Sequence, residues 1–149
     1  MSLLDMDERL LDVATRYELV YSPLIDAKEF PDNVDVTLVE GAVSTEADLA
    51  KIRKIRGRTR TLVSLGDCAV TGNIPALRNL LPPGEALAVY DHPPRSEVPA
   101  LRHVQPVHQV VPVELHLPGC PPSADAIHEV LIALLEGRAP DVRGARFGN

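Results

Sequence analysis

The chain has 149 residues, which favours one domain and is long enough to bury a core without disulfides or a metal. Its 15 basic and 21 acidic residues leave a formal charge of −6, which disfavours a protein that follows nucleic-acid phosphates. No apolar run is long enough for a membrane span, and Met1–Asp5 lacks the basic start of a classical signal peptide. Two cysteines do not make a disulfide scaffold, so we expect a reducing cytoplasm.

The first half of the chain alternates predicted helices and strands. The elements are a helix from Ser2 to about Tyr17, a strand over Val34–Val39, a helix capped by Ser44 and Thr45 that ends near Arg56, a strand over Thr61–Leu65, and a short helix with Pro75 at its first position that ends near Leu81. Apolar residues at helical spacing define the helices, and β-branched runs that end at glycine define the strands. Right-handed crossovers then predict a parallel α/β sheet with helices on both faces.

The second half begins with a proline-rich stretch. Ten of the 14 prolines lie between Pro82 and Pro122, so long regular elements are not expected there. The run Val110–Leu115 still predicts a strand, and its internal proline favours a sheet edge. Ser123 caps a final amphipathic helix that Gly137 terminates.

Both cysteines follow predicted strands and stand beside glycine. Cys68 lies in Gly-Asp-Cys-Ala, two residues after Gly66, and Cys120 lies in Pro-Gly-Cys-Pro-Pro, directly after Gly119. Ligands of open α/β sheets collect outside the carboxyl ends of the strands, so the two thiols are expected to face one site. The glycines let the backbone approach a bulky group and offer N–H donors to anionic sulfur.

Spacing alone leaves other interpretations open. A lone cysteine is commonly a small buried hydrophobic residue. Zinc requires four ligands, typically in close pairs, and no second pair accompanies His116 and Cys120. A nucleophilic Cys–His pair could use His92, His103, His108 or His116, and nothing selects among them. We expect all five histidines, His128 included, to be ordinary surface or core residues.

Three segments together resemble a known family. They are Val39–Val43, Ser64–Asn79 with its Gly-x-Cys-Ala element, and Leu117–Pro122. They resemble the small, electron-transferring subunit of [NiFe] hydrogenases, above all that of the soluble, bidirectional NAD-linked enzymes, to which Met1–Leu10 is also similar. The resemblance continues to about Arg138, and the related cluster-bearing subunit of respiratory NADH dehydrogenase shares the same pair of cysteine motifs.

The resemblance implies a flavodoxin-like fold, with residues 1–149 as one electron-transfer domain, and a proximal [4Fe–4S] cluster held by four cysteines. The later two correspond to Cys68 and Cys120, beside Gly66 and Gly119 as cofactor-binding residues. The family's first two cysteines form a C-x-x-C after its first strand, upstream of the helix that begins at Ser2. This sequence contains neither, and we expect that the strand and its loop are omitted rather than lost.

The resemblance also implies a function. The chain is expected to be an oxidoreductase subunit with no catalytic residue of its own. Electrons from H2 oxidation at a large Ni–Fe subunit would pass through the cluster toward diaphorase subunits that bind NAD and FMN. A quinone-linked respiratory subunit is the nearest alternative. From another class, a flavodoxin-like FMN-binding or interaction module without a cluster is also open, although no residue argues for FMN independently.

Four other features have an ordinary interpretation beside the one that resemblance implies. Glu40 either faces the large subunit or is a solvated carboxylate at a strand end. Arg78 and Asn79 either shape the cluster pocket or the subunit contact, or lie on the surface. Asp67 is equally a turn residue, and the basic run over 51–60 is expected to be a solvated helix face and turn.

Overall fold

The computed structural model describes residues 4–23, 25–82, 85 and 99–142. Its elements are η1 Leu4–Met6, α1 Glu8–Arg16, β1 Val34–Glu40, β2 Val43–Thr45, α2 Glu46–Arg56, β3 Thr59–Leu65, α3 Asp67–Thr71, α4 Asn73–Ala76, η2 Leu77–Leu80, β4 Ala100–Gln105, η3 Val107–Gln109, β5 Leu115–Leu117 and α6 Ala124–Leu135. None of the described helices is long and apolar enough to span a membrane.

Three parallel strands form the central sheet, in the order β1-β3-β5. Glu40 of β1 pairs with Leu65 of β3, and Leu65 pairs in turn with Leu117 of β5. The carboxyl ends of all three strands therefore meet at one edge of the sheet. The predicted α/β fold with a parallel sheet is confirmed.

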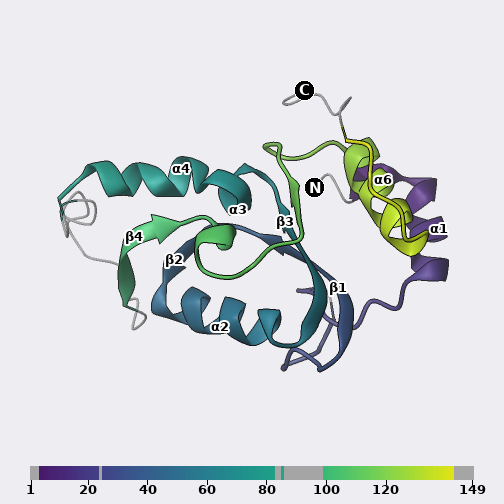
Figure 1. Cartoon of the computed structure of the whole chain (residues 1–149), viewed down its shortest axis with the longest axis horizontal. Coiled ribbons are helices and arrows are strands. Elements are labelled where there is room, and N and C mark those ends of the chain that lie inside the picture. The colour runs from purple at the N-terminus through teal and green to yellow at the C-terminus, as the bar shows by residue number, and fades with distance from the viewer. Residues whose placement is uncertain (1–3, 24, 83–84, 86–98, 143–149) are drawn as a thin grey trace.

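Helices cover both faces of this sheet (Figure 1). The face toward α1 and α6 buries one apolar cluster: Met6, Val13, Val63, Leu65, Leu117, Ala126, Ile127, Val130 and Leu131. The face toward α2 buries a second: Phe30, Val43, Ile52, Ile55, Leu62, Ala69, Val107 and Val111. Successive residues of β3 point into opposite clusters, which explains why its sequence is almost continuously apolar.

Two helices begin as predicted. Thr45 accepts a hydrogen bond from the Asp48 N–H, and the Asp48 carboxylate accepts one from the Thr45 N–H, so α2 starts with a complete capping box. The Ser123 hydroxyl accepts a hydrogen bond from the Ala126 N–H at the start of α6. Gly137, with φ of +66°, follows the end of α6.

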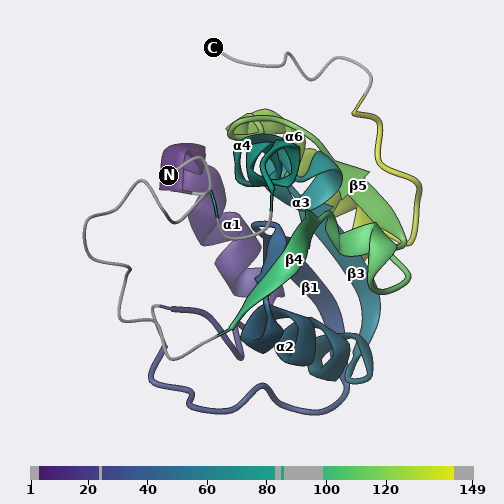
Figure 2. The same ribbon diagram turned by 90° about the vertical axis from the view of Figure 1, so that its left-hand side faces the viewer.

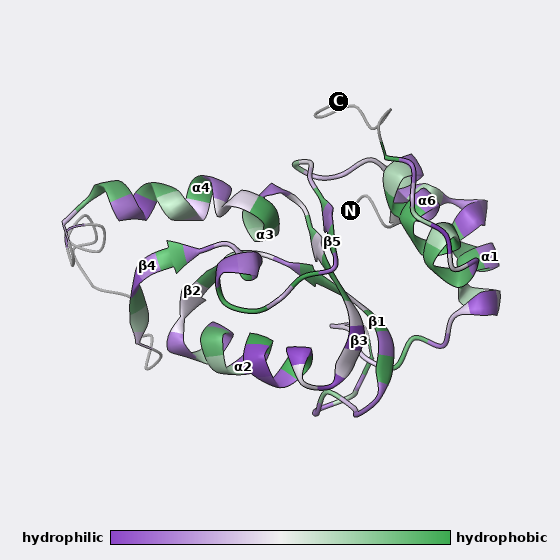
Figure 3. Cartoon of the chain, in the orientation of Figure 1, coloured by the Kyte–Doolittle hydropathy of each residue, from purple (hydrophilic) through white to green (hydrophobic). Residues whose placement is uncertain are grey.

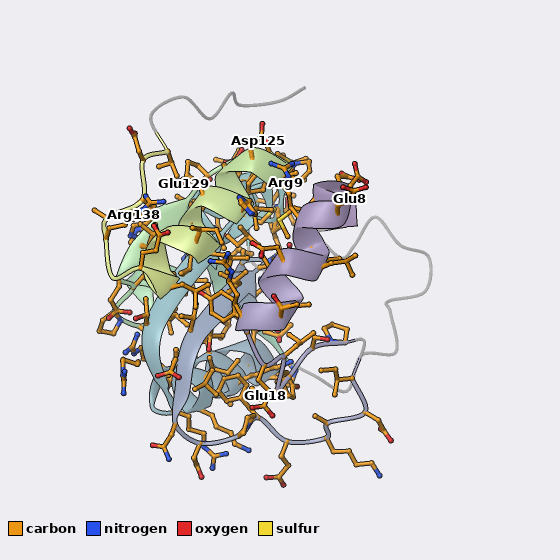
Figure 4. The ribbon with its side chains drawn as sticks, turned by 90° about the vertical axis from the view of Figure 1, so that its right-hand side faces the viewer. Glu8, Arg9, Glu18, Asp125, Glu129 and Arg138 are labelled. Carbon is orange, nitrogen blue, oxygen red and sulfur yellow. The ribbon has the colours of Figure 1, made fainter. Side chains whose placement is uncertain are left out.

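The predicted N-terminal helix is wrong as one continuous element. Asp7 has a φ of +50° and separates η1 from α1, and this break lets Met6 bury completely beneath α6. The expected cap at Ser2 lies outside the described residues. An ion pair of 2.6 Å between Arg9 of α1 and Asp125 of α6 joins the two helices on the outer side of the molecule (Figure 4).

The strand predicted over Val110–Leu115 is also wrong in its position. The chain turns through η3 and buries Val111 in the core, and β5 begins only at Leu115. An apolar run thus reflects burial here rather than pairing. The edge position that the internal proline favours is nevertheless found, because β5 is an edge strand of the parallel sheet among the described residues.

A second sheet and a helical arm lie beside the main sheet. β2 pairs antiparallel with β4, a pairing that the sequence did not predict because β4 lies within the proline-rich stretch. The arm, defined as α4 and η2 over residues 73–80, leads away from the sheet edge, and β4 lies between it and α2 (Figures 1 and 2). The short helix predicted here begins at Asn73, so Pro75 is its third residue rather than its first. Pro75 still lies in the first turn, where backbone N–H groups have no intrahelical partner.

Candidate functional site

Cys68 and Cys120 lie in two loops at the carboxyl edge of the parallel sheet. Cys68 is the second residue of α3, directly after β3, and Cys120 lies in the loop between β5 and α6. The Cys68 side chain is half-buried, Cys120 is exposed, and neither forms a disulfide. Both thiols are therefore free to bind a soft metal as thiolates.

Three hydrogen bonds join these two loops. The Gly66 N–H donates to the Leu117 carbonyl at 2.7 Å, and the Asp67 N–H donates to the Gly119 carbonyl at 2.8 Å. The Gly119 N–H donates to Asp67 Oδ1 at 2.7 Å. The segments that precede Cys68 and Cys120 are thus held side by side, although the cysteines are 52 positions apart in the sequence.

Gly66 and Gly119 make this close approach possible. Gly119 has a φ of +138°, and a Cβ on it would lie 2.5 Å from Pro122 Cα. Gly66 has a φ of +83°, and a Cβ on it would lie 3.5 Å from the Gly119 carbonyl oxygen. From the sequence their N–H groups are expected to face sulfur, whereas both N–H groups are bonded to protein oxygens here. Their role as cofactor-binding residues stays a prediction.

The donor set at this edge fits part of an iron–sulfur ligand shell. Two thiolates with glycine backbone beside them are typical ligands of a cluster, and a [4Fe–4S] cluster takes four. Within the part of the chain described by the structure, no group of three or more His, Cys, Asp or Glu residues could hold a metal ion. The resemblance implies two further cysteine ligands, which the given sequence does not contain.

The histidines do not complete the site. His116 Nδ1 lies 2.8 Å from the Ser64 hydroxyl, within the sheet rather than in the cysteine loops. The His108 ring packs against the His116 ring with 5.5 Å between centroids. His103 is exposed on β4, and His92 lies outside the described residues. A nucleophilic Cys–His pair gains no support from these contacts.

Three residues that the sequence left as surface or turn positions have defined partners. Arg78 Nη2 donates to the Ser44 and Leu101 carbonyls, both at 3.0 Å, and therefore ties η2 to the second sheet. Asn79 is likewise half-buried and bonded to β4. Asp67 bonds across to the other cysteine loop. A polar side chain at a motif position was the available signal, but its partner could not be read from the sequence.

The remaining motif residues are Glu40 and the basic run over 51–60. Glu40 is exposed at the same sheet edge as the cysteines. Four residues of the basic run form ion pairs: Lys54 with Glu29 at 3.9 Å, Arg56 with Glu114 at 2.7 Å, Arg58 with Asp32 at 2.9 Å and Arg60 with Asp35 at 3.3 Å. These pairings account for much of the positive charge between α2 and β3 without a phosphate.

The chain is similar in sequence to known proteins. Residues 1–134 match the family described as the NADH ubiquinone oxidoreductase 20 Kd subunit. The chain is 39% identical to one subunit of the vhu F420-non-reducing hydrogenase of Methanocaldococcus jannaschii, over 94% of this chain and 52% of that protein. It is 36% identical to the delta subunit of the NAD-reducing hydrogenase HoxS of Cupriavidus necator, over 95% of this chain and 75% of that protein. The chain thus spans about half the length of the first relative and three quarters of the second.

A solved structure shares the fold. A chain in the crystal structure of NAD+-reducing [NiFe]-hydrogenase in the H2-reduced state superimposes with a TM-score of 0.88 at 36% identity. The match covers 94% of the present chain and 85% of that chain. The likeness therefore extends over nearly the whole chain.

Proposed function

The chain belongs to the family of the NADH ubiquinone oxidoreductase 20 Kd subunit, and on that basis we propose that it is the electron-transfer small subunit of a cytoplasmic [NiFe] hydrogenase. The hydrogenase assignment is supported by relatives that are subunits of hydrogenases, including an NAD-reducing enzyme. NAD is the proposed final acceptor, reached through diaphorase subunits that bind NAD and FMN.

The observation that carries the proposal is that hydrogen bonds hold the two cysteine loops together at one edge of the sheet. Cys68 and Cys120 would supply two of the thiolates that hold a [4Fe–4S] cluster. Such a cluster, when bound, supplies one-electron transfer at a potential that the protein tunes through charge and hydrogen bonding. Leu65 and Leu117, the last residues of β3 and β5, are 5% and 1% exposed, so the strand ends that lead into the loops are closed to water.

An exposed apolar stripe supports the proposal that the chain binds a large partner subunit. It consists of Ile74, Leu77, Leu80 and Leu81, which are between 47% and 80% exposed. The stripe lies on the arm and just past its end, in direct chain continuity with the helix that carries Cys68. Clustered exposed apolar side chains are typical of protein interfaces. The proposed partner is the large Ni–Fe subunit, which must approach this end for electrons to enter.

The function is tested on the protein purified anaerobically with its partners. Iron and acid-labile sulfide are measured per chain, together with H2-dependent NAD reduction and NADH oxidation by the diaphorase alone. Cys68→Ala and Cys120→Ala are expected to lose cluster iron and H2-dependent NAD reduction while keeping NADH oxidation. Thr71→Ser, on the same short helix as Cys68, keeps the hydroxyl that bonds the Asp67 carbonyl and serves as the control. Intact H2-driven reduction in the Cys120 variant would overturn the electron-transfer role. Flavin absorbance in the same preparation tests the proposed FMN.

A second candidate is a subunit of a quinone-linked respiratory complex. The observation that favours it is the family itself, which is described by a ubiquinone-reducing enzyme. The two candidates differ in the electron donor and acceptor of the purified complex. Reduction of NAD by H2 supports the first, and NADH-dependent quinone reduction without H2 oxidation supports the second.

A further inference from the structure

Asp67 and Gly119 immediately precede the two cysteines and bond to each other twice. The Asp67 N–H donates to the Gly119 carbonyl, and Asp67 Oδ1 accepts from the Gly119 N–H. From this reciprocal pair we propose that Asp67 is a positioning residue, whose carboxylate fixes Cys120 relative to Cys68. The inference rests on the proposed function, because it concerns the thiolates that would hold the cluster.

The side chain of Asp67 takes over where main-chain pairing ends. The parallel ladder between β3 and β5 runs to Leu65 and Leu117, and the Gly66 N–H makes one further bond to Leu117. Beyond that point the positive φ of Gly66 turns the chain into α3, so no carbonyl of the first loop reaches the Gly119 N–H. The Asp67 carboxylate reaches it instead, at a distance typical of charge-assisted bonds.

Both ends of this contact are held. Thr71 Oγ1 donates to the Asp67 carbonyl at 2.8 Å, which fixes Asp67 within α3. Gly119 is buried, so its N–H has little access to water as an alternative partner. A shift of the Gly119 peptide moves Cys120 directly, because the two residues are adjacent. The bond crosses from one loop to the other, which an ordinary turn aspartate bonding its own backbone would not do.

Two substitutions separate the acceptor from the charge. Asp67→Asn keeps a side-chain carbonyl that can accept from the Gly119 N–H, whereas Asp67→Ala removes the acceptor. A general loss of stability is controlled by Val130→Ala, which opens a cavity in the core where α6 packs. A change of surface charge is controlled by Asp26→Ala, an exposed aspartate in the segment before β1.

The first measurement is the rate at which dibromobimane joins Cys68 to Cys120 in the protein freed of iron, detected as fluorescence. The rate is normalised to the labelling of each thiol by a monofunctional maleimide. Asp67→Ala is expected to slow bridging about tenfold, and Asp67→Asn and both controls are expected to match the wild type. Unchanged bridging in Asp67→Ala, equal loss in Asp67→Asn or Val130→Ala, or no bridging in the wild type would overturn the proposal.

The second measurement is iron per chain and the electron paramagnetic resonance spectrum of the reduced complex. Asp67→Ala is expected to lose more than half of the iron or to change the spectrum, with Asp67→Asn retaining the iron. Full iron and a wild-type spectrum in Asp67→Ala would overturn the positioning role but leave the proposed function standing. Absence of iron from the wild-type complex would instead contradict the proposed function, and the bridging rates would still decide the role of Asp67.

Discussion

The side-chain amide of Asn79 pairs with the backbone of Val104 as a neighbouring strand would. Asn79 Nδ2 donates to the Val104 carbonyl and Asn79 Oδ1 accepts from the Val104 N–H, both at 2.8 Å. Together with Arg78, it directs the polar side of the arm inward onto β4. The apolar side is thereby turned toward solvent, and hydrophobic residues alternate with hydrophilic ones along the arm (Figure 3). The hydrogen bonds that anchor the arm to β4 therefore also leave its apolar side exposed.

Replacement of Asn79 should release the arm from β4. Asn79→Ala removes the partner of the N–H and of the carbonyl of Val104, a buried residue, which costs about 1–3 kcal/mol. Hydrogen exchange, followed by mass spectrometry on the protein isolated with its partners, should accelerate in β4 and the arm. Asn79→Asp keeps the acceptor and should fall between the wild type and the alanine variant. Unchanged exchange in β4 after Asn79→Ala would contradict the anchoring role.

Charge on the exposed stripe should separate the chain from its partner. Leu77 and Leu80 are 58% and 80% exposed, so lysine at either position is compatible with the fold of this chain. The double variant L77K/L80K should no longer co-purify with the large subunit. Leu11→Lys, on α1 and 70% exposed, is the matched control and should co-purify normally.

The same stripe bears on self-association. Expressed alone, the wild-type chain is expected to form aggregates or oligomers, and L77K/L80K should shift it toward monomer in size-exclusion chromatography. Retention of the partner by the double variant would show that the stripe is not the subunit contact. A monodisperse wild-type monomer with a cooperative melt would argue for a stand-alone module.

The elements that could be located well from the sequence are those with local signals. The capping box of Thr45 and Asp48 and the cap at Ser123 specify helix starts through residues three positions apart, so α2 and α6 begin as predicted. The element between Val110 and Leu115 failed because burial of Val111 in the core produces the same apolar pattern as a buried strand. The pairing of β2 with β4 is non-local and has no short-range signal.

Part of the candidate site could likewise be predicted from local signals. The predicted strand ends and the glycines that follow them placed the Cys68 and Cys120 loops at one sheet edge. The structure brings those loops together through the Gly66–Leu117 and Asp67–Gly119 hydrogen bonds. The bond from Gly119 to the Asp67 carboxylate could not be predicted. It depends on the positive φ of Gly66, which orients the aspartate across the gap rather than toward its own turn.

A side chain at Gly119 should disrupt the cysteine loops. Alanine there would place its Cβ 2.5 Å from Pro122 Cα, a backbone clash that rotation of a side chain cannot relieve. Gly41→Ala is the control, since Gly41 also has a positive φ of +82° but no atom within 4 Å of the added Cβ. The control should cost about 1 kcal/mol from backbone strain alone. Gly119→Ala should lower the melting temperature further and reduce bridging of Cys68 to Cys120, and equal effects of the two variants would contradict the clash.

The Glu114 carboxylate should make stability depend on pH at the acidic end. Burial raises its pKa, but the Leu62 N–H and Arg56, both 2.7 Å from Oε2, outweigh that effect and lower the pKa below 4.5. The Glu114 carboxylate of the unfolded chain therefore binds a proton at a higher pH than that of the folded chain. The stability that the ionised carboxylate contributes is complete above about pH 5, and it is lost as the pH falls through 4.5 toward the folded-state pKa. Glu114→Gln keeps an acceptor for Leu62 but loses the charge. Its melting temperature should lie below that of the wild type at pH 7, and the difference should shrink as the pH falls below 4.5. Glu18→Gln, at an exposed position after α1, should follow the wild type throughout, and a constant gap between Glu114→Gln and the wild type from pH 7 to 3 would exclude a titrating role for Glu114.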